Sequence, residues 1–296
     1  MLKLDNVKVQ FKDQVAVDLN REIDIATGER VGIIGSNGAG KTTLLKAILG
    51  IVPYSGRIIS DVPMKAIGVH MQQNEYCEMV PIKVIMEMIL GHSLKSDPQV
   101  QELIDFFDFS PCLTKRWKHL SGGQKQRLTL ILVMARPSPL VMFDEVTSGL
   151  DFVTRDNLMR KLVTWYAGKE TTLLITSHYY AELNNLADKI LLIDHGQVVD
   201  YGSKEFLFKK YCGASVLTFP ISTQGSAIAA NHDLIIAPNG QIAIRCQSPE
   251  EELSVTAKLV AANINYQRTN HDIELISLNA LARQNERKEE RKENHE

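Results

Sequence analysis

The first residues that could do chemistry lie in the glycine-rich stretch GSNGAGKTT, residues 35–43. Gly35, Gly40, Lys41 and Thr42 match the pattern G-x-x-x-x-G-K-[ST], in which glycines let backbone N–H groups turn inward around phosphate oxygens. The lysine neutralises the outer phosphates, and the threonine hydroxyl suits magnesium. We therefore predict a phosphate-binding loop, whose other members are Ser36, Asn37, Gly38, Ala39 and Thr43.

A second glycine pair stands far downstream, in the stretch LSGGQKQR, residues 120–127. One phosphate chain needs only one loop, so the pair raises the question of what a second set of amides binds. Glycine amides at the start of a helix form an anion site of their own. The sequence thus predicts two separate places for phosphate oxygens in one chain.

Polar side chains come directly after two further apolar stretches. LVMFDE places Asp144 and Glu145 at the end of a buried strand, and TTLLITSH places His178 just beyond another. The first acid suits magnesium, and the second is placed to polarise an attacking water. Asp144 and Glu145 could instead be an ordinary solvated pair of acids, and His178 a structural histidine. The presence of a phosphate-binding loop favours the interpretation in which all three lie at the same edge of the sheet and act on phosphate.

The elements that must hold these residues alternate between strands and helices. Apolar strands are expected at residues 30–34, 65–71, 139–143, 171–176 and 189–194, and the glycine loop leads into a helix that ends at Gly50. This alternation predicts an α/β fold with a largely parallel, covered sheet. Residues 2–11 and 15–25 predict strands joined by a polar turn, and residues 73–120 predict a helical insertion.

The composition changes after about Tyr211. SVLTFPI, DLIIAP and QIAIRC predict short strands, and SPEEELSVTAKLVAAN predicts a helix capped by Ser248 with Pro249 in its first turn. DIELISL predicts a further strand. We expect a main domain over residues 1–210, a small α+β domain over 211–282, and a mixed-charge tail over 283–296 that is a solvated helix or disordered.

The overall composition argues against a nucleic-acid-binding protein, a disulfide-rich protein and a membrane-spanning protein. The chain has 296 residues, of which 44% are hydrophobic, and a formal net charge of −2, so no basic field predicts nucleic-acid binding. The four cysteines lack paired or metal-ligand spacing, which favours reduced thiols. The longest apolar run, residues 128–135, falls far short of the roughly 20 residues of a membrane span. We expect a cytoplasmic chain whose membrane role, if any, comes through a partner.

The phosphate loop, LSGGQ, the DE pair with SGLD, and SH in this order resemble the ATP-binding-cassette ATPases. The resemblance covers residues 1–210 and implies a P-loop NTPase core of the RecA-like type that binds ATP and Mg²⁺. In this family two cassettes pair head to tail, and the LSGGQ of one closes over the ATP of the other. The resemblance thus implies that Ser121, Gly122, Gly123 and Gln124 act in trans, which accounts for the second glycine pair.

The resemblance also implies roles for single residues. It assigns adenine stacking to Phe11, magnesium sensing to Gln72 with Gln73 as the rival, magnesium binding to Asp144, the general base to Glu145, a contact across the dimer to Asp151, and the γ-phosphate switch to His178. One position departs from the family, which usually has proline after the base, where this chain has Val146. Losing the proline frees φ and restores an N–H, which puts the aim of Glu145 in doubt.

The resulting hypothesis is the ATP-hydrolysing subunit of a transporter of the bacterial drug- and antibiotic-export type. The partners would be an integral membrane permease and a second cassette, identical or different, on the inner face of the cell membrane. The segment EMVPIKVIMEMILG, residues 78–91, has three methionines and is either core or a groove for the permease. An amino-acid importer with a regulatory C-terminal domain stays open as well.

The alternative from another class is a soluble ATPase of the same family that acts on ribosomes or DNA. Ribosome-bound members usually carry two cassettes, whereas this sequence has one phosphate loop and one LSGGQ. DNA-repair members split their halves with a long coiled coil, and no heptad run is found. The sequence therefore favours transport.

Overall fold

The structure is a computed structural model that describes residues 1–71 and 75–293. Most strands of the described chain form one sheet in the order β3-β1-β2-β10-β9-β4-β8-β7-β6, and β5 pairs with β1. The strands of this sheet are β1 Leu2–Phe11, β2 Gln14–Asp18, β3 Ile23–Ile25, β4 Arg30–Ile34, β5 Ser55–Ser60, β6 Ile67–His70, β7 Leu140–Asp144, β8 Thr172–Thr176, β9 Lys189–Asp194 and β10 Gln197–Ser203.

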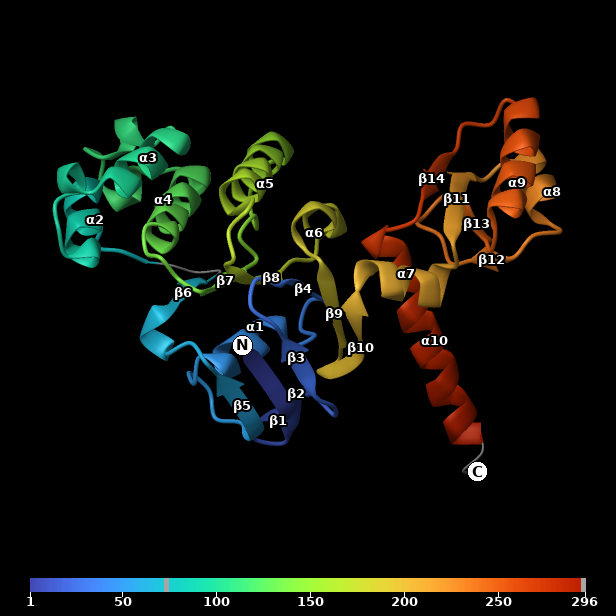
Figure 1. The fold of residues 1–296 in the computed structure, drawn as a ribbon, viewed down its shortest axis with the longest axis horizontal. Helices are drawn as coiled ribbons and strands as arrows, with labels where there is room; N and C mark the ends of the chain where they lie inside the picture. The colour runs from blue at the N-terminus through green and yellow to red at the C-terminus, as the bar shows by residue number, and fades with distance from the viewer. Residues whose placement is uncertain (72–74, 294–296) are drawn as a thin grey trace.

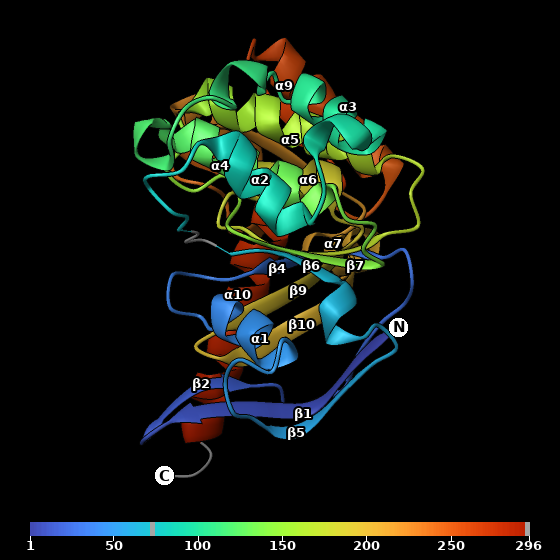
Figure 2. The ribbon, with the colours of Figure 1, turned by 90° about the vertical axis from the view of Figure 1, so that its left-hand side faces the viewer.

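Five neighbouring strands, β6, β7, β8, β4 and β9, run parallel, as their apolar sequences predict. Every residue of β7 is buried, and its side chains alternate between two hydrophobic clusters. One cluster surrounds helix α1 (Lys41–Ile48), which lies between the parallel strands and the β1–β5 layer (Figure 2). The other packs under α4 (Gly122–Met134), α5 (Phe152–Tyr166) and α6 (Tyr180–Leu186). The parallel strands thus carry their loops to one shared edge.

The segment between β6 and β7 is helical, as predicted, and forms one end of the molecule (Figure 1). It contains α2 (Ile82–Leu90), α3 (Pro98–Phe106) and α4. Asp97 accepts hydrogen bonds from the first turn of α3, and Pro98 occupies its first position, so the local sequence fixes where that helix begins. Among the described helices, none is both long and apolar enough to cross a membrane.

A second sheet lies at the opposite end of the molecule (Figure 1). Its strands are β11 Ser215–Pro220, β12 Leu234–Ile235, β13 Gln241–Cys246 and β14 Gln267–Thr269, in the order β12-β13-β11-β14, with α8 Thr223–Ala229 and α9 Pro249–Ala261 between them. All its pairings are antiparallel, which makes a ferredoxin-like β-α-β-β-α-β unit with its own small core. Ser248 caps α9, as the sequence predicts.

The C-terminal segment differs from the expectation at one place. The predicted strand at DIELISL is wrong, because helix α10 runs from Ile273 to Glu293. Ile273, Ile276 and Ala280 are buried at helical spacing, and the Asn184 side chain of α6 caps the first turn. Residues 283–293 continue this helix, which agrees with the helical alternative given above for the tail and not with the disordered one.

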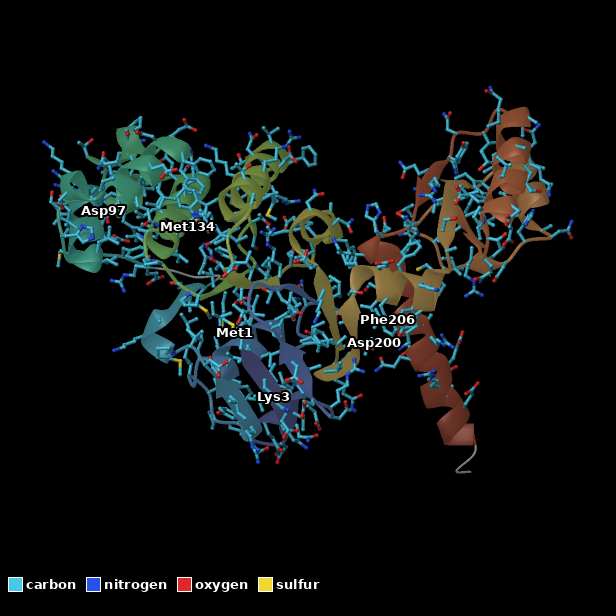
Figure 3. The ribbon with its side chains drawn as sticks, viewed as in Figure 1. Met1, Lys3, Asp97, Met134, Asp200 and Phe206 are labelled. Carbon is cyan, nitrogen blue, oxygen red and sulfur yellow. The ribbon has the colours of Figure 1, made fainter. Side chains whose placement is uncertain are left out.

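The second sheet and α10 are joined to the main domain by α7 (Lys204–Cys212). Asp200 of β10 lies beside α7 (Figure 3) and accepts hydrogen bonds from Arg21 (2.9 Å) and from Lys210 (2.6 Å) and Tyr211 (2.7 Å) in the last turn of that helix. Burial alone would raise the pKa of Asp200, but the hydrogen bonds from Lys210, Tyr211 and Arg21 lower it to about 2. Helix α10 then packs back on α6 and α7, so the unit is tied to the main domain at both of its ends.

Candidate functional site

The glycine loop connects β4 to α1, the strand–loop–helix context that a phosphate site requires. A side chain at Gly35 would bring its Cβ within 2.3 Å of the Ile193 carbonyl oxygen. At Gly40, where φ is +102°, a Cβ would come within 2.4 Å of the Ala16 carbonyl oxygen. Only glycine fits these two positions, so the pattern seen in the sequence has a steric cause.

Lys41 is the first residue of α1 and is 5% exposed. Its ammonium donates to the carbonyl oxygens of Gly35 (2.8 Å) and Ser36 (3.1 Å) and lies 3.8 Å from Glu145 Oε1. Burial lowers the pKa of Lys41, while the Glu145 and Asp144 carboxylates act in the opposite direction. The lysine is thus folded across the mouth of its own loop, where phosphate oxygens would replace the carbonyls.

Oxygen ligands for a magnesium ion meet beside the loop. The Thr42 hydroxyl donates to Asp144 Oδ2 at 2.9 Å, and Asp144 is fully buried at the end of β7. Thr176, at the end of β8, donates to Asp144 Oδ1 at 2.7 Å and holds the carboxylate in place. A hydroxyl and a carboxylate are ligands that Mg²⁺ prefers, so these residues fit the ion. Magnesium binding by Thr42 and Asp144 stays a prediction.

Glu145 and His178 come together from two strand ends. The N–H of Glu145 donates to the Thr176 hydroxyl (3.0 Å), and Glu145 has a positive φ of 47° that few non-glycine residues adopt. Its carboxylate lies 3.7 Å from His178 Nδ1 as well as near Lys41. Strained backbone held by neighbours is common at functional sites. The base and the switch predicted from sequence are therefore neighbours.

A cavity of about 680 Å³ opens over these residues. Its lining includes Asn37–Thr43, Glu145 and His178, together with residues that the sequence did not point to: Gln14, Val15, Ala16, Ser148 and His195. The His195–Gly196 turn has positive φ at both residues, and the Gly196 N–H bonds the Ala39 carbonyl, which places the turn against the loop. A His-Gly pair between two strands is a turn signal that could have drawn attention.

Phe11, the predicted adenine contact, is not among the described residues that line this cavity. Phe11 is 46% exposed at the end of β1 and pairs with Gln14, which does line the cavity, so adenine stacking stays a prediction. Gln72 and its rival Gln73 lie outside the described residues.

The LSGGQ segment stands apart from this cavity, at the start of α4. Ser121 is the N-cap, and its hydroxyl accepts from the Gln124 N–H at 3.3 Å, while the Gln124 side chain accepts from the Ser121 N–H at 3.1 Å. A Cβ built on Gly122 meets nothing within 4 Å, so this glycine faces open space. Asp151, the predicted dimer contact, caps the neighbouring helix α5 and is exposed. The chain brings Ser121 to its own surface and not to its own Lys41.

Known proteins share this arrangement. A family model described as "ABC transporter" matches residues 19–148. The glycine betaine/carnitine/choline transport ATP-binding protein OpuCA of Bacillus subtilis is 29% identical over 230 residues, which are 71% of this chain and 59% of that protein. The Nod factor export ATP-binding protein I of Rhizobium sp. strain N33 is also 29% identical, over 73% of this chain and 75% of that protein.

The chain belongs to the ATP-binding-cassette ATPases. The fold agrees: an ATP-binding subunit of an ABC transporter superposes with a TM-score of 0.62 at 20% identity, over 71% of this chain and 93% of that one. A dimeric cassette in a post-hydrolysis state, bound to ADP and Pi, superposes with a TM-score of 0.61 over 69% of this chain. The fold class and the ATPase class predicted from the sequence are therefore confirmed.

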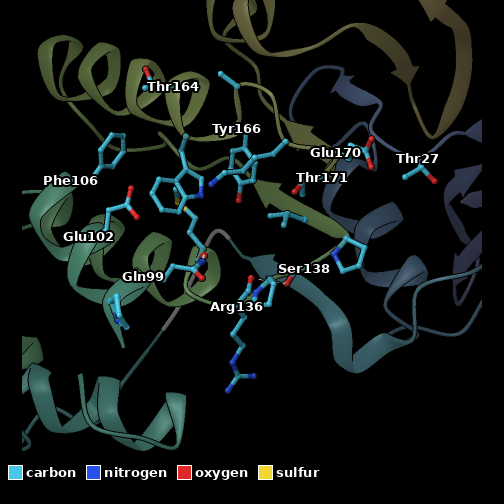
Figure 4. A pocket seen from close by; sticks show the side chains of 18 residues that line it. Thr27, Gln99, Glu102, Phe106, Arg136, Ser138, Thr164, Tyr166, Glu170 and Thr171 are labelled. Atoms are coloured by element: carbon cyan, nitrogen blue, oxygen red, sulfur yellow. Dashed lines mark hydrogen bonds between the residues drawn. The ribbon is translucent and has the colours of Figure 1, made fainter. Parts of the chain in front are cut away.

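A cavity larger than the one over the phosphate loop lies elsewhere on the cassette. It measures about 1150 Å³ and is bounded by Phe106 and Glu102 of α3, Tyr166 at the end of α5, and Ser138 and Thr171 ahead of β7 and β8 (Figure 4). Ser138 and Thr171 mark the amino ends of the parallel strands, whereas the phosphate loop is at their carboxyl ends. Ligands of open α/β sheets bind outside the carboxyl ends, so the smaller cavity is the candidate site.

Proposed function

We propose that this protein is the ATP-binding and ATP-hydrolysing subunit of a transporter and that it drives a separate membrane permease. The observation that carries the proposal is the pairing of a complete phosphate site with a distant, exposed LSGGQ segment in one chain. Relatives named for choline transport, Nod factor export and sn-glycerol-3-phosphate import support it. None of these names points to ribosomes or DNA, so the soluble alternative is not favoured.

In the proposed reaction, Glu145 accepts a proton from water as the water oxygen attacks the γ-phosphorus, and the bond to the bridging oxygen of ADP breaks. Lys41 turns from the loop carbonyls to the β- and γ-phosphates. His178, beside Glu145, donates to the γ-phosphate and keeps the water in line. A magnesium ion held by Thr42 and Asp144 would spread the charge that develops on the leaving group.

We place the permease contact on α2 of the helical insertion. Met86 is fully buried there, whereas Met79 just before the helix is 63% exposed and Met88 within it is 74% exposed. Val84 and Ile89 extend this apolar surface. Flexible thioether side chains suit a groove that receives a helix. Of the two alternatives for residues 78–91, core or permease groove, we therefore propose the groove.

Export is the direction we propose. Relatives named for Nod factor export, which are 29% and 30% identical to this chain, support this direction. On this proposal the protein sits on the inner face of the cell membrane through its permease.

The test is to co-express the chain with candidate polytopic membrane proteins, starting with any that a neighbouring reading frame encodes, reconstitute the complex in vesicles and measure ATPase activity. Met88→Glu should abolish stimulation by the membrane protein and leave the basal ATPase rate of the isolated chain intact. Leu253→Glu is the matched control, because Leu253 is 71% exposed on α9, at the far end of the molecule. Equal stimulation of all three forms would contradict the α2 contact, and no stimulation of the parent chain would contradict the transport proposal.

A further inference from the structure

A carboxylate that the catalytic assignments do not use lies beneath the active-site loops. Glu182 of α6 is 7% exposed, so its charge is almost wholly withdrawn from water. The Thr147 hydroxyl donates to its Oε1 at 2.5 Å, and the Ser177 hydroxyl donates to its Oε2 at 2.7 Å. Both donors are themselves buried. A buried carboxylate with a hydrogen bond to each oxygen is a rigid bridge between the groups that donate.

The two donors stand next to the residues that do the chemistry. Thr147 is two residues after Glu145, and the intervening turn is closed by a bond from the Ser148 N–H to the Glu145 carbonyl (3.0 Å). Ser177 directly precedes His178, and its hydroxyl also accepts from the Tyr179 N–H at 2.9 Å. Glu182 therefore joins the loop of the base to the loop of the switch.

A third loop is tied to the same carboxylate through Arg155. The guanidinium Nε of Arg155 lies 3.7 Å from Glu182 Oε1, and its plane covers the Tyr179 ring at 3.6 Å. The same guanidinium donates to the carbonyl of Leu150 at 3.1 Å, directly before Asp151. Glu182 is thus linked, directly or through Arg155, to the loops that carry Glu145, His178 and Asp151.

The departure at Val146 makes this bridge important. Val146 is buried, and no hydrogen bond from its N–H is found in the described part of the chain. Valine does not fix φ as proline would, while Glu145 before it must keep a positive φ. The next residue along, Thr147, is the first whose side chain is anchored, and its anchor is Glu182.

We propose that Glu182 is a positioning residue for ATP hydrolysis, which aims Glu145 through Thr147 and His178 through Ser177. The Thr147–Glu182 bond supplies the restraint that a proline after the base would otherwise provide. The proposal rests on hydrolysis at Glu145, as set out above, and adds a residue that touches neither nucleotide nor water.

The first test removes the anchor without changing its volume much. Thr147→Val should lower kcat about 10- to 100-fold, because small misplacements of a reacting group cost that much. The KM for ATP and the affinity for a fluorescent ATP analogue should stay unchanged, since Lys41 and the glycine loop are untouched. Thr147→Ser keeps a hydroxyl and should retain most of kcat. Thr164→Val, which removes an exposed hydroxyl from α5, is the matched control.

The decisive variant adds the proline back. In the Thr147→Val background, Val146→Pro should raise kcat, because a fixed φ replaces the lost side-chain anchor. A general loss of packing would not be reversed by that change, and melting temperatures of all variants check that each is folded. Unchanged kcat in Thr147→Val, or no recovery on adding Val146→Pro, would overturn the positioning role.

Measuring the ATPase rate of Glu145→Gln alongside that of Thr147→Val distinguishes a failure of the positioning proposal from a failure of the proposed function. If Glu145→Gln is inactive while Thr147→Val turns over normally, only the role of Glu182 fails. If Glu145→Gln itself keeps full turnover, the hydrolysis assignment fails, and the positioning proposal falls with it.

Discussion

Helices α1 and α4 both begin at the glycines of a predicted anion site, and their surroundings differ. The start of α1 has Lys41 and the predicted base Glu145 at a cavity of about 680 Å³, and a buried Asp144 behind them accepts from Thr42. The start of α4 has a capping box between Ser121 and Gln124 and open space in front of it. The first region can bind a nucleotide and activate water, while the second offers only donors. From this difference we propose that the second region completes a site on another cassette.

The largest expected effect is on the chemistry of the first region. Glu145→Gln should reduce turnover about 10²- to 10⁴-fold, the usual contribution of a positioned general base. Nucleotide binding should persist, because the phosphate loop does not depend on this carboxylate. Single-turnover ATPase rates and binding of an ATP analogue measure the two quantities separately. Wild-type turnover in this variant would show that another group activates the water.

The next largest effect concerns binding in the same region. Lys41→Ala removes a charge-assisted contact to phosphate and should weaken ATP affinity roughly 10- to 100-fold. Lys46→Ala, in the last turn of the same helix, removes an equal charge away from the loop and is the matched control. Titration with a fluorescent ATP analogue compares the two. Equal affinities would mean that the loop does not hold the phosphates.

The smallest expected effect lies between the two regions. His70, at the end of β6, is fully buried and 2.7 Å from the Gln126 side chain of α4. Burial lowers the pKa of His70, although the contact with Gln126 acts in the opposite direction. Because His70 binds a proton less readily in the folded chain than in the unfolded chain, the free energy of unfolding should be highest above about pH 6.5. Below that pH it should fall by at most about 1.4 kcal/mol per pH unit.

His70→Gln should remove this pH dependence. Melting temperatures of the parent and the variant, measured across mildly acidic and neutral pH, would test the expectation. The same slope in both would show that other groups titrate, and that the link between β6 and α4 does not depend on a neutral histidine.

The two regions were also unequal in how far the sequence predicted them. In the first region the sequence singled out the lining residues Asn37–Thr43, Glu145 and His178, because Gly35 and Gly40 are required by close backbone approach and a strand must precede the loop. His195 was not predicted. It lies in the turn between β9 and β10, and only the pairing of these strands within the sheet brings that turn to the cavity. The role of the second region came from the family resemblance, since a capped glycine helix has no chemistry of its own.

The errors in the predicted fold also come from contacts between segments that are far apart in the sequence. β5 and β10 were not predicted, because SGRIIS and QVVDYGS are short and rich in glycine and polar residues, and they become strands by pairing with β1 and β9. The start of α10 fits a strand as well as a helix, since Ile273 and Leu275 alternate. Its capping by Asn184, far away in the chain, is a tertiary contact that no local pattern shows.

The central claim is that Lys41 of one chain and the LSGGQ of another complete one site, and mixing two inactive variants tests it directly. Lys41→Ala removes the lysine of the phosphate loop at the start of α1. Gly122→Asp puts a negative charge at the start of α4, where a side chain has room. Gly122→Ala, which adds no charge, controls for the side chain and should stay active. Each damaged variant alone should lack ATPase activity, and their co-expressed mixture should regain it, because a mixed dimer holds one intact site. A mixture as inactive as its components would contradict the account.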